Sequence, residues 1–197
     1  MQHQHGEHLT PGADAAAVLA SLHRNSDGLL VMGRYKAVCR DADGNEKWTE
    51  EFDNLVTDVG AKLLLDTILG GSAFTATTYM GLKGTGAAAV GDTQASHAAW
   101  LEVGTTNAPQ YTAPRKTVTW NAASGSGAGS RTKTSSSTNT YAIITTGGTV
   151  DGAFLNINGT SAIDNTTGTL FSAGTFSGGA KTVAVSDTLT VTYALNI

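Results

Sequence analysis

The sequence predicts a mainly β protein with an antiparallel sandwich or barrel, and three observations lead to this fold class. Charged residues make up only 14% of the 197 residues, whereas an ordinary globular domain has about 25%. From Phe74 onward, short strand-like segments recur between Gly, Ser, Asn and Asp residues. Residues 188–196 alternate apolar and polar side chains, which is typical of a strand with one buried face.

Length and composition predict one domain preceded by an arm. Residues 1–28 are polar and rich in alanine, and we expect them to form an extended N-terminal arm. A short helix is possible over residues 14–24, with Asp14 as its cap, but a helix of this length needs a partner surface. Residues 29–197 are expected to form the β-sandwich domain.

Residues 29–56 predict a β-hairpin. The strands LLVMGRYKAVCR and EKWTEEFDNLV flank the turn DADGN, in which Asp43-Gly44 tolerates a positive φ. In the first strand Tyr35, Ala37 and Cys39 alternate with mainly basic residues, so one face is expected to be apolar and the other basic. The acidic second strand is expected to place carboxylates opposite the basic residues, in a solvated hairpin.

Residues 57–69 predict the best helix in the chain. Thr57 or Asp58 can cap its start, Leu64 and Ile68 contribute to an apolar stripe, and Gly70-Gly71 ends it. We expect this helix, near 58–69, to pack on one face or end of the β domain.

Most of the remaining sequence predicts short strands and loops. The strand candidates contain, in order, TYMGLK, the residues after Trp100, KTVTW, TYAIITT, TVDGAFLNI, GTLFSAGT and the region from Lys181 to Asn196. The low-complexity stretch at 124–138 predicts a long flexible loop. In the last strand Leu189, Val191, Tyr193 and Leu195 are expected to face the core, which leaves a Thr-rich outer face as a candidate contact surface.

We predict no catalytic, cofactor-binding or metal-binding residue. His3, His5 and His8 lie beside Gly6 in the arm, where ligands are not held at fixed geometry. The turn DADGN lacks the Gly and Glu positions of a calcium loop. The single Cys39 permits no internal disulfide and is interpreted as a small buried apolar residue.

Four other polar residues, Asp66, Asp92, His97 and Glu102, have no spacing that indicates a site. We interpret His97, in the segment ASHAAW, as a structural hydrogen-bonding residue. Because no group of titratable residues indicates an active site, we expect the protein not to be an enzyme.

Charge and hydropathy exclude several classes of partner. The net charge is −4 and the chain has no basic run, so we expect no binding to nucleic acid. No apolar run approaches the ~20 residues of a membrane span, and no signal peptide is evident. We therefore expect synthesis in the cytoplasm and no membrane partner.

The chain also resembles a family of small virion structural proteins of tailed bacteriophages over roughly residues 30–197. The segments that carry the resemblance are the hairpin with Lys47-Trp48, DNLV at 53–56, YMGL at 79–82, DTQASHAAW at 92–100, GAFL at 152–155, GTLFSAG at 168–174 and DTLTVTY at 187–193. The segments ASHAAW and GTLFSAG are the most specific.

This resemblance implies a non-enzymatic part of the phage particle. We expect a capsid decoration, or cement, protein that binds the outer surface of the capsid shell and stabilises it, with the alternative of a tail or head-fibre component. Decoration proteins of this type are similar to β-sandwich or jelly-roll domains and are often trimeric. The expected partners are the major capsid protein and two further copies of the chain, and the expected location is the surface of the virion.

Overall fold

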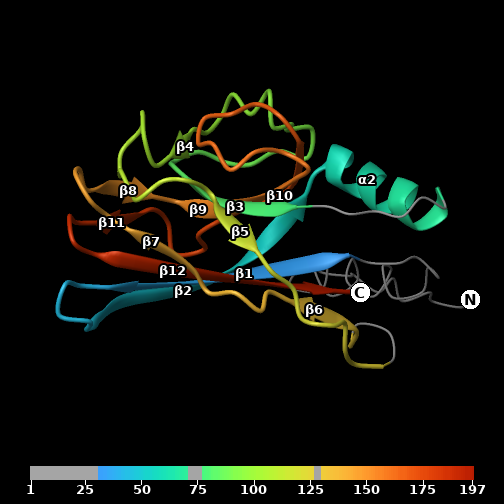
Figure 1. The fold of residues 1–197 in the computed structure, drawn as a ribbon, viewed down its shortest axis with the longest axis horizontal. Helices are drawn as coiled ribbons and strands as arrows, with labels where there is room; N and C mark the ends of the chain where they lie inside the picture. The colour runs from blue at the N-terminus through green and yellow to red at the C-terminus, as the bar shows by residue number, and fades with distance from the viewer. Residues whose placement is uncertain (1–30, 71–76, 127–129) are drawn as a thin grey trace, which may run out of the picture. The chain divides into compact units, whose positions relative to one another are not determined.

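Ten of the twelve β-strands that the computed structural model describes form one curled antiparallel sheet (Figure 1). The structure describes residues 31–70, 77–126 and 130–197. The predicted arm at 1–28, its helix at 14–24 and His3, His5 and His8 lie outside the described residues. The rest of the chain confirms the predicted class, because it is mainly β, antiparallel and consistent with a β-sandwich-like fold that has one short helix.

The strands follow one another along the chain with the helix after the second. They are β1 (Met32–Arg40), β2 (Glu46–Val56), β3 (Thr78–Lys83), β4 (Glu102–Val103), β5 (Lys116–Val118), β6 (Thr132–Thr134), β7 (Asn139–Ala142), β8 (Gly148–Val150), β9 (Gly152–Ile157), β10 (Thr169–Thr175), β11 (Lys181–Val183) and β12 (Thr188–Asn196). Helix α2 spans Asp58–Leu69. The main sheet has the order β4-β3-β9-β10-β2-β1-β12-β6, with β5 beside β3 and β7 beside β12, while β8 and β11 pair separately.

The N-terminal hairpin agrees with its prediction. Strands β1 and β2 pair antiparallel, and the turn at 41–45 has Gly44 at φ 86°. The side chain of Asp41 accepts hydrogen bonds from the main-chain N–H groups of Asp43 and Asn45, which favour the tight turn. Tyr35, Ala37 and Cys39 are fully buried, as their alternation predicts.

Strand β2 connects the two halves of the curled sheet. Its residues 46–53 pair with β1, and its residues 54–56 pair with β10. One long strand therefore belongs to both the β1–β12 half and the β9–β10 half, and the main-chain hydrogen bonding continues around the bend.

The segment 110–124 lies between the far ends of the same sheet. Its residues 116–118 pair with β3 as strand β5. On its other side, Thr112 N donates to Ala142 O at 3.0 Å, and Ser136 N donates to Thr119 O at 2.8 Å. Backbone hydrogen bonds thus link β3 to the β6–β7 side, so the curl leaves few of these groups open to solvent.

The core lies inside the curl. Strands of both halves of the sheet supply most of its buried side chains. The buried side chains include Tyr35, Phe52, Met80, Leu82, Tyr111, Tyr141, Leu155, Leu189, Val191 and Tyr193. A second cluster of Trp100, Phe154, Leu170 and Ala173 packs on the opposite face of β9 and β10. These two strands are therefore buried on both faces, which explains their nearly continuous apolar sequences.

Helix α2 begins and ends where predicted but packs differently. Thr57 is its N-cap and accepts a hydrogen bond from Gly60 N at 3.1 Å, and Gly70 is the C-cap. The side chain of Thr57 also donates to Leu170 O. Gly60 is the buried residue of the helix, whereas the predicted stripe residue Ile68 is exposed. Leu64, the other predicted stripe residue, is half-buried, and the hydrogen bonds of Thr57 hold the start of the helix on β10.

The low-complexity stretch at 124–138 is in part a strand, so the prediction of a long flexible loop was wrong there. Residues 132–134 form β6 and pair with β12, and Ser124 and Thr132 exchange two backbone hydrogen bonds of 2.9 Å. Thr has a high β propensity, and β12 supplies the backbone partners, which local sequence patterns do not reveal. Composition alone therefore missed the pairing.

Candidate interaction surfaces

The outer face of the β1–β2 hairpin carries paired charges. Arg34 Nε lies 3.1 Å from the Asp53 carboxylate, and Lys36 Nζ lies 3.0 Å from that of Glu51. A third pair joins Arg40 to Glu46 at 3.6 Å. The structure thus confirms that acidic residues of the second strand face basic residues of the first. Each such exposed pair contributes at most about 1 kcal/mol to stability, but together the pairs neutralise this surface.

Hydroxyl groups continue the same face across β12. The pairing register sets Thr192 opposite Lys36, and Thr190 opposite both Val38 and Thr140. The Oγ1 atoms of Thr140 and Thr190 are 3.4 Å apart. The outer face of this half of the sheet is therefore broad, uncharged on β12 and charge-neutral on the hairpin.

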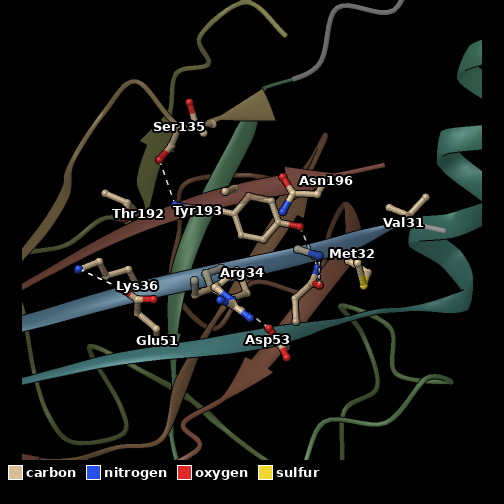
Figure 2. A pocket seen from close by; sticks show the side chains of 15 residues that line it. Val31, Met32, Arg34, Lys36, Glu51, Asp53, Ser135, Thr192, Tyr193 and Asn196 are labelled. Carbon is tan, nitrogen blue, oxygen red and sulfur yellow. Dashed lines mark hydrogen bonds and ion pairs between the residues drawn. The ribbon is translucent and has the colours of Figure 1, made fainter. Parts of the chain in front are cut away.

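A hollow of about 780 Å³ lies at one end of this region. Figure 2 shows residues of β1, β2 and β12 around it, together with Ser135 just after β6. Tyr193 OH accepts a hydrogen bond of 2.8 Å from Asn54 Nδ2, and Asn54 Oδ1 accepts one of 2.7 Å from Gly33 N. These bonds fix the phenol and the amide beside the hollow, on the inward side of the strands, where Tyr193 is buried.

The outward side of α2 is apolar. Leu65, Ile68 and Leu69 are 55%, 61% and 79% exposed. Ala61, Leu65 and Ile68 follow the spacing i, i+4, i+7, which is the spacing of a helix–helix seam. We call Ala61, Leu65, Ile68 and Leu69 the α2 stripe. Because large aliphatic side chains gather on one side of one helix, the stripe is a candidate contact surface.

A buried ion pair organises the loops that cover the second core cluster. Arg115 donates from two nitrogens to the two carboxylate oxygens of Glu102, at 2.7 and 2.6 Å, and both side chains are almost fully buried. Arg115 also donates to the main-chain oxygens of Thr160 and Asn165. Burial raises the pKa of Glu102, whereas the contacts with Arg115 oppose this shift. The pair joins β4, the start of β5 and the loop before β10.

Two of the four other polar residues contact Trp100. Asp92 accepts a hydrogen bond of 2.9 Å from the indole N–H of Trp100, and the His97 ring stacks on that indole with 4.0 Å between ring centroids. His97 Nδ1 lies 2.9 Å from Trp100 O. Because a carbonyl oxygen only accepts, His97 is the donor and acts as the expected structural hydrogen-bonding residue.

The structure does not assemble these residues into an acid–base site. His97 and Glu102 line one pocket of about 350 Å³. Both oxygens of Glu102, however, accept hydrogen bonds from Arg115, and one also accepts from Asp164 N at 2.8 Å. Asp66 lies apart, on α2. Within the described ranges, no group of three His, Cys, Asp or Glu residues is placed to hold a metal ion.

Sequence reasoning missed the buried charged residues. Arg115, Lys83, Glu102 and Asp151 all lie in the interior. Lys and Arg are almost never fully buried unless they are paired. Here Arg115 pairs with Glu102 and Lys83 with Asp151, and neither pair has a sequence spacing that indicates the contact. Only the three-dimensional arrangement brings these side chains together.

Comparisons with protein-family models, curated protein sequences and solved structures return no match for this chain. Among the helical residues that the structure describes, none belong to a helix with the length and hydropathy needed to cross a membrane.

Proposed function

We propose that this chain is a non-enzymatic capsid decoration protein of a tailed bacteriophage, which binds the outer surface of the assembled shell and stabilises it. The proposal starts from the sequence resemblance. A protein that binds the closed shell more tightly than its open or dissociated forms stabilises the closed shell by mass action. No cofactor is required for this role.

The observation that carries the proposal is the neutral outer face of β2, β1 and β12. Its exposed charges are paired within the chain, as in Arg34–Asp53 and Lys36–Glu51, and its remaining groups include the hydroxyls of Thr190 and Thr192. A lasting protein contact favours such a face, because no unpaired charge loses its water when the contact forms. We assign this face to the major capsid protein.

We assign the α2 stripe to contacts between copies of the chain, in a homotrimer. Its seam spacing at Ala61, Leu65 and Ile68 fits an identical apolar helix. The charged residues Lys62 and Asp66 lie beside the stripe rather than within it, in the position of a polar rim. In a trimer around a three-fold axis, the stripe residues Leu65, Ile68 and Leu69, which are exposed in one copy, become buried between copies. Closed cyclic trimers also suit the three-fold positions of a shell.

Light scattering on the purified protein tests the assembly. We expect the mass of a trimer, and we expect the double variant Leu65→Ser/Ile68→Ser to have the mass of a monomer. The matched control is Lys62→Ser, on the same helix but outside the stripe, which should remain trimeric. A wild-type protein that stays monomeric at high concentration contradicts the assignment of the stripe.

Cosedimentation with shells of the phage's major capsid protein tests the function. We expect the wild-type protein to sediment with closed shells and to raise the temperature at which they open. The variant Thr190→Lys/Thr192→Lys, which adds unpaired charge to the neutral face, should bind at least tenfold more weakly. If the protein binds purified tails and ignores shells, the decoration role is wrong and the alternative, a tail or head-fibre component, takes its place.

A further inference from the structure

Lys83 and Asp151 are held side by side in the interior by neighbouring strands. Lys83 ends β3 and pairs with Gly152, the first residue of β9, so Asp151 lies one residue away from its pairing partner. Asp151 N donates a hydrogen bond of 2.8 Å to Lys83 O. The side chains are 0% and 11% exposed. The backbone therefore fixes an amine and a carboxylate next to each other away from solvent.

The amine of Lys83 donates hydrogen bonds to two carbonyl oxygens and lies beside the Asp151 carboxylate without a hydrogen bond of normal length to it. Nζ donates to Gly84 O at 3.0 Å and to Gly86 O. The carboxylate of Asp151 is its third polar contact, at 3.7 Å from Oδ2. That distance exceeds the usual 2.7–3.2 Å range of an N–H···O bond. If the amine is neutral, its two N–H groups still donate to the carbonyl oxygens of Gly84 and Gly86. Its lone pair then points toward Asp151.

The surroundings favour the neutral, nucleophilic amine. Burial lowers the pKa of Lys83, although the negative charges of Asp151 and Asp92 partly oppose this shift. The ring of Trp100 lies beside the amine, with 6.0 Å from Nζ to its centroid. A desolvated lysine is an activated nucleophile, and reacting groups held in contact gain an effective concentration that no pair in free solution has.

We propose that Lys83 and Asp151 form an intramolecular isopeptide bond after folding. A proton moves from the ammonium group of Lys83 to the carboxylate of Asp151, which gives a neutral amine and a carboxylic acid. The Nζ lone pair then attacks Cγ of Asp151. The bond from Cγ to the hydroxyl oxygen breaks, Nζ gives up a further proton, and that proton leaves with the hydroxyl group as one water molecule. No oxidant, reductant or cofactor is consumed.

The bond replaces two buried charges with one neutral amide and covalently joins β3 to β9. Its remaining N–H still has a glycine carbonyl as acceptor. Since the reactants meet only when these strands pair, the bond marks molecules that have folded correctly. The inference stands independently of the proposed function.

Intact-mass spectrometry of the denatured full-length protein tests the proposal. We expect a mass lower than the sequence mass by one water molecule, and a protease digest in which the peptides of Lys83 and Asp151 travel as one branched species. Lys47 and Asp187 provide an internal control, because they also form an ion pair, at 2.5 Å, but Lys47 is partly exposed. Their peptides should remain separate. An unchanged intact mass, in fresh and in aged protein alike, overturns the proposal.

Two variants distinguish the isopeptide bond from other reactions that release one water molecule. Lys83→Met removes the nucleophile and should restore the sequence mass. Asp151→Asn should still form the same bond, with loss of one ammonia molecule. Asp-Gly sequences also lose water by cyclising to a succinimide, and the chain has three of them, at Asp27-Gly28, Asp43-Gly44 and Asp151-Gly152. A water loss that maps to a linear peptide sensitive to hydroxylamine contradicts the proposal, even where the Lys83 variant does not fold.

Discussion

Arg115 and Glu102 illustrate how much one pair of residues can depend on the surrounding structure. Their two-pronged contact, with N–O distances of 2.7 and 2.6 Å, lies in the interior, where a charge without a partner is poorly tolerated. The same guanidinium lies over the Phe154 ring, 5.4 Å from its centroid. The pair therefore combines charge, hydrogen bonding and packing in one place.

Arg115→Met should lower the free energy of unfolding by about 3–5 kcal/mol, because it leaves the Glu102 carboxylate buried without its cation. Urea unfolding followed by tryptophan fluorescence measures the loss. The double variant Arg115→Met/Glu102→Leu removes both charges and should lose less than Arg115→Met alone. If the single and double variants are equally unstable, packing rather than charge accounts for the effect.

Cys39 should be unreactive in the folded protein. Burial, followed by the charge of Asp187, raises the pKa of this thiol to about 11, and the thiolate is the reactive form. We expect a thiol reagent at pH 8 to label the unfolded protein at least a hundredfold faster than the native protein. Rapid labelling of the native chain contradicts the described burial of Cys39.

At the scale of elements, helix α2 depends on one residue without a side chain. A Cβ placed on Gly60 lies 2.2 Å from Phe171 O, on the backbone of β10. The helix start is further held by Thr57 N, which donates to Phe171 O at 3.1 Å, and by Asp58 N, which donates to Val90 O at 2.9 Å. The close approach of helix and strand is therefore possible only for glycine at position 60.

Gly60→Ala should displace α2 and lower the free energy of unfolding by about 1–3 kcal/mol, the usual cost of overpacking. Elsewhere in the helix, an exposed substitution such as Lys62→Ala should change stability by less than about 0.5 kcal/mol. Chemical denaturation of both variants checks the contrast. A stable Gly60→Ala protein shows that the helix does not need this contact.

The ion pair between Glu50 of β2 and Lys181, the first residue of β11, makes the stability of the fold depend on pH. Lys181 lies 2.8 Å from Glu50, and its hydrogen bond is the main cause that lowers the pKa of Glu50 below the ordinary 4.5. A lowered pKa in the folded state gives stability that is present above pH 4.5 and is lost as pH falls through the folded value. Between pH 7 and pH 3, the free energy of unfolding should fall less for Glu50→Gln than for the wild-type protein, and the difference should be at most about 1 kcal/mol. Unfolding curves recorded across this pH range measure it. An identical pH profile in the two proteins contradicts this role of the pair.

The elements also show what the sequence can predict. Alternation placed Tyr35, Ala37 and Cys39 inside, and capping residues placed both ends of α2, because these signals are local. The sequence did not predict which side of α2 would be covered, since Gly60 gives no hydrophobic signal and its importance comes from Phe171, far along the chain. Buried Lys83 and Arg115 were missed for the same reason, because their partners are distant in sequence.

At the scale of the whole molecule, the poorly charged β12 is not an open edge. It pairs with β1 along one side and with β7 and β6 along the other. Its inward residues Leu189, Val191 and Tyr193 are buried, as the alternation predicts. This poorly charged segment therefore leaves no unpaired strand edge in the described part of the chain, and only its outer face remains for contacts with other molecules.

The predicted arm belongs to this scale too. Deleting residues 1–28 should leave the β domain folded, because β1 begins at Met32. If the arm orders on a neighbouring molecule, as its polar composition favours, the truncated protein should bind capsid shells at least tenfold more weakly. Circular dichroism checks the fold and cosedimentation checks binding. Equal binding by both proteins excludes a role for the arm in attachment.

The position of β12 between β1 and β7 also sets an order of events during synthesis. Ribosomes add about 5–20 residues per second, so residues 188–196 emerge well after the strands that they pair with. Until then, the inward faces of β1 and β7 lack their central neighbour, and Tyr35 and Tyr141 have no Tyr193 or Leu189 beside them. The nascent chain therefore cannot complete this half of the sheet until residues 188–196 have left the exit tunnel.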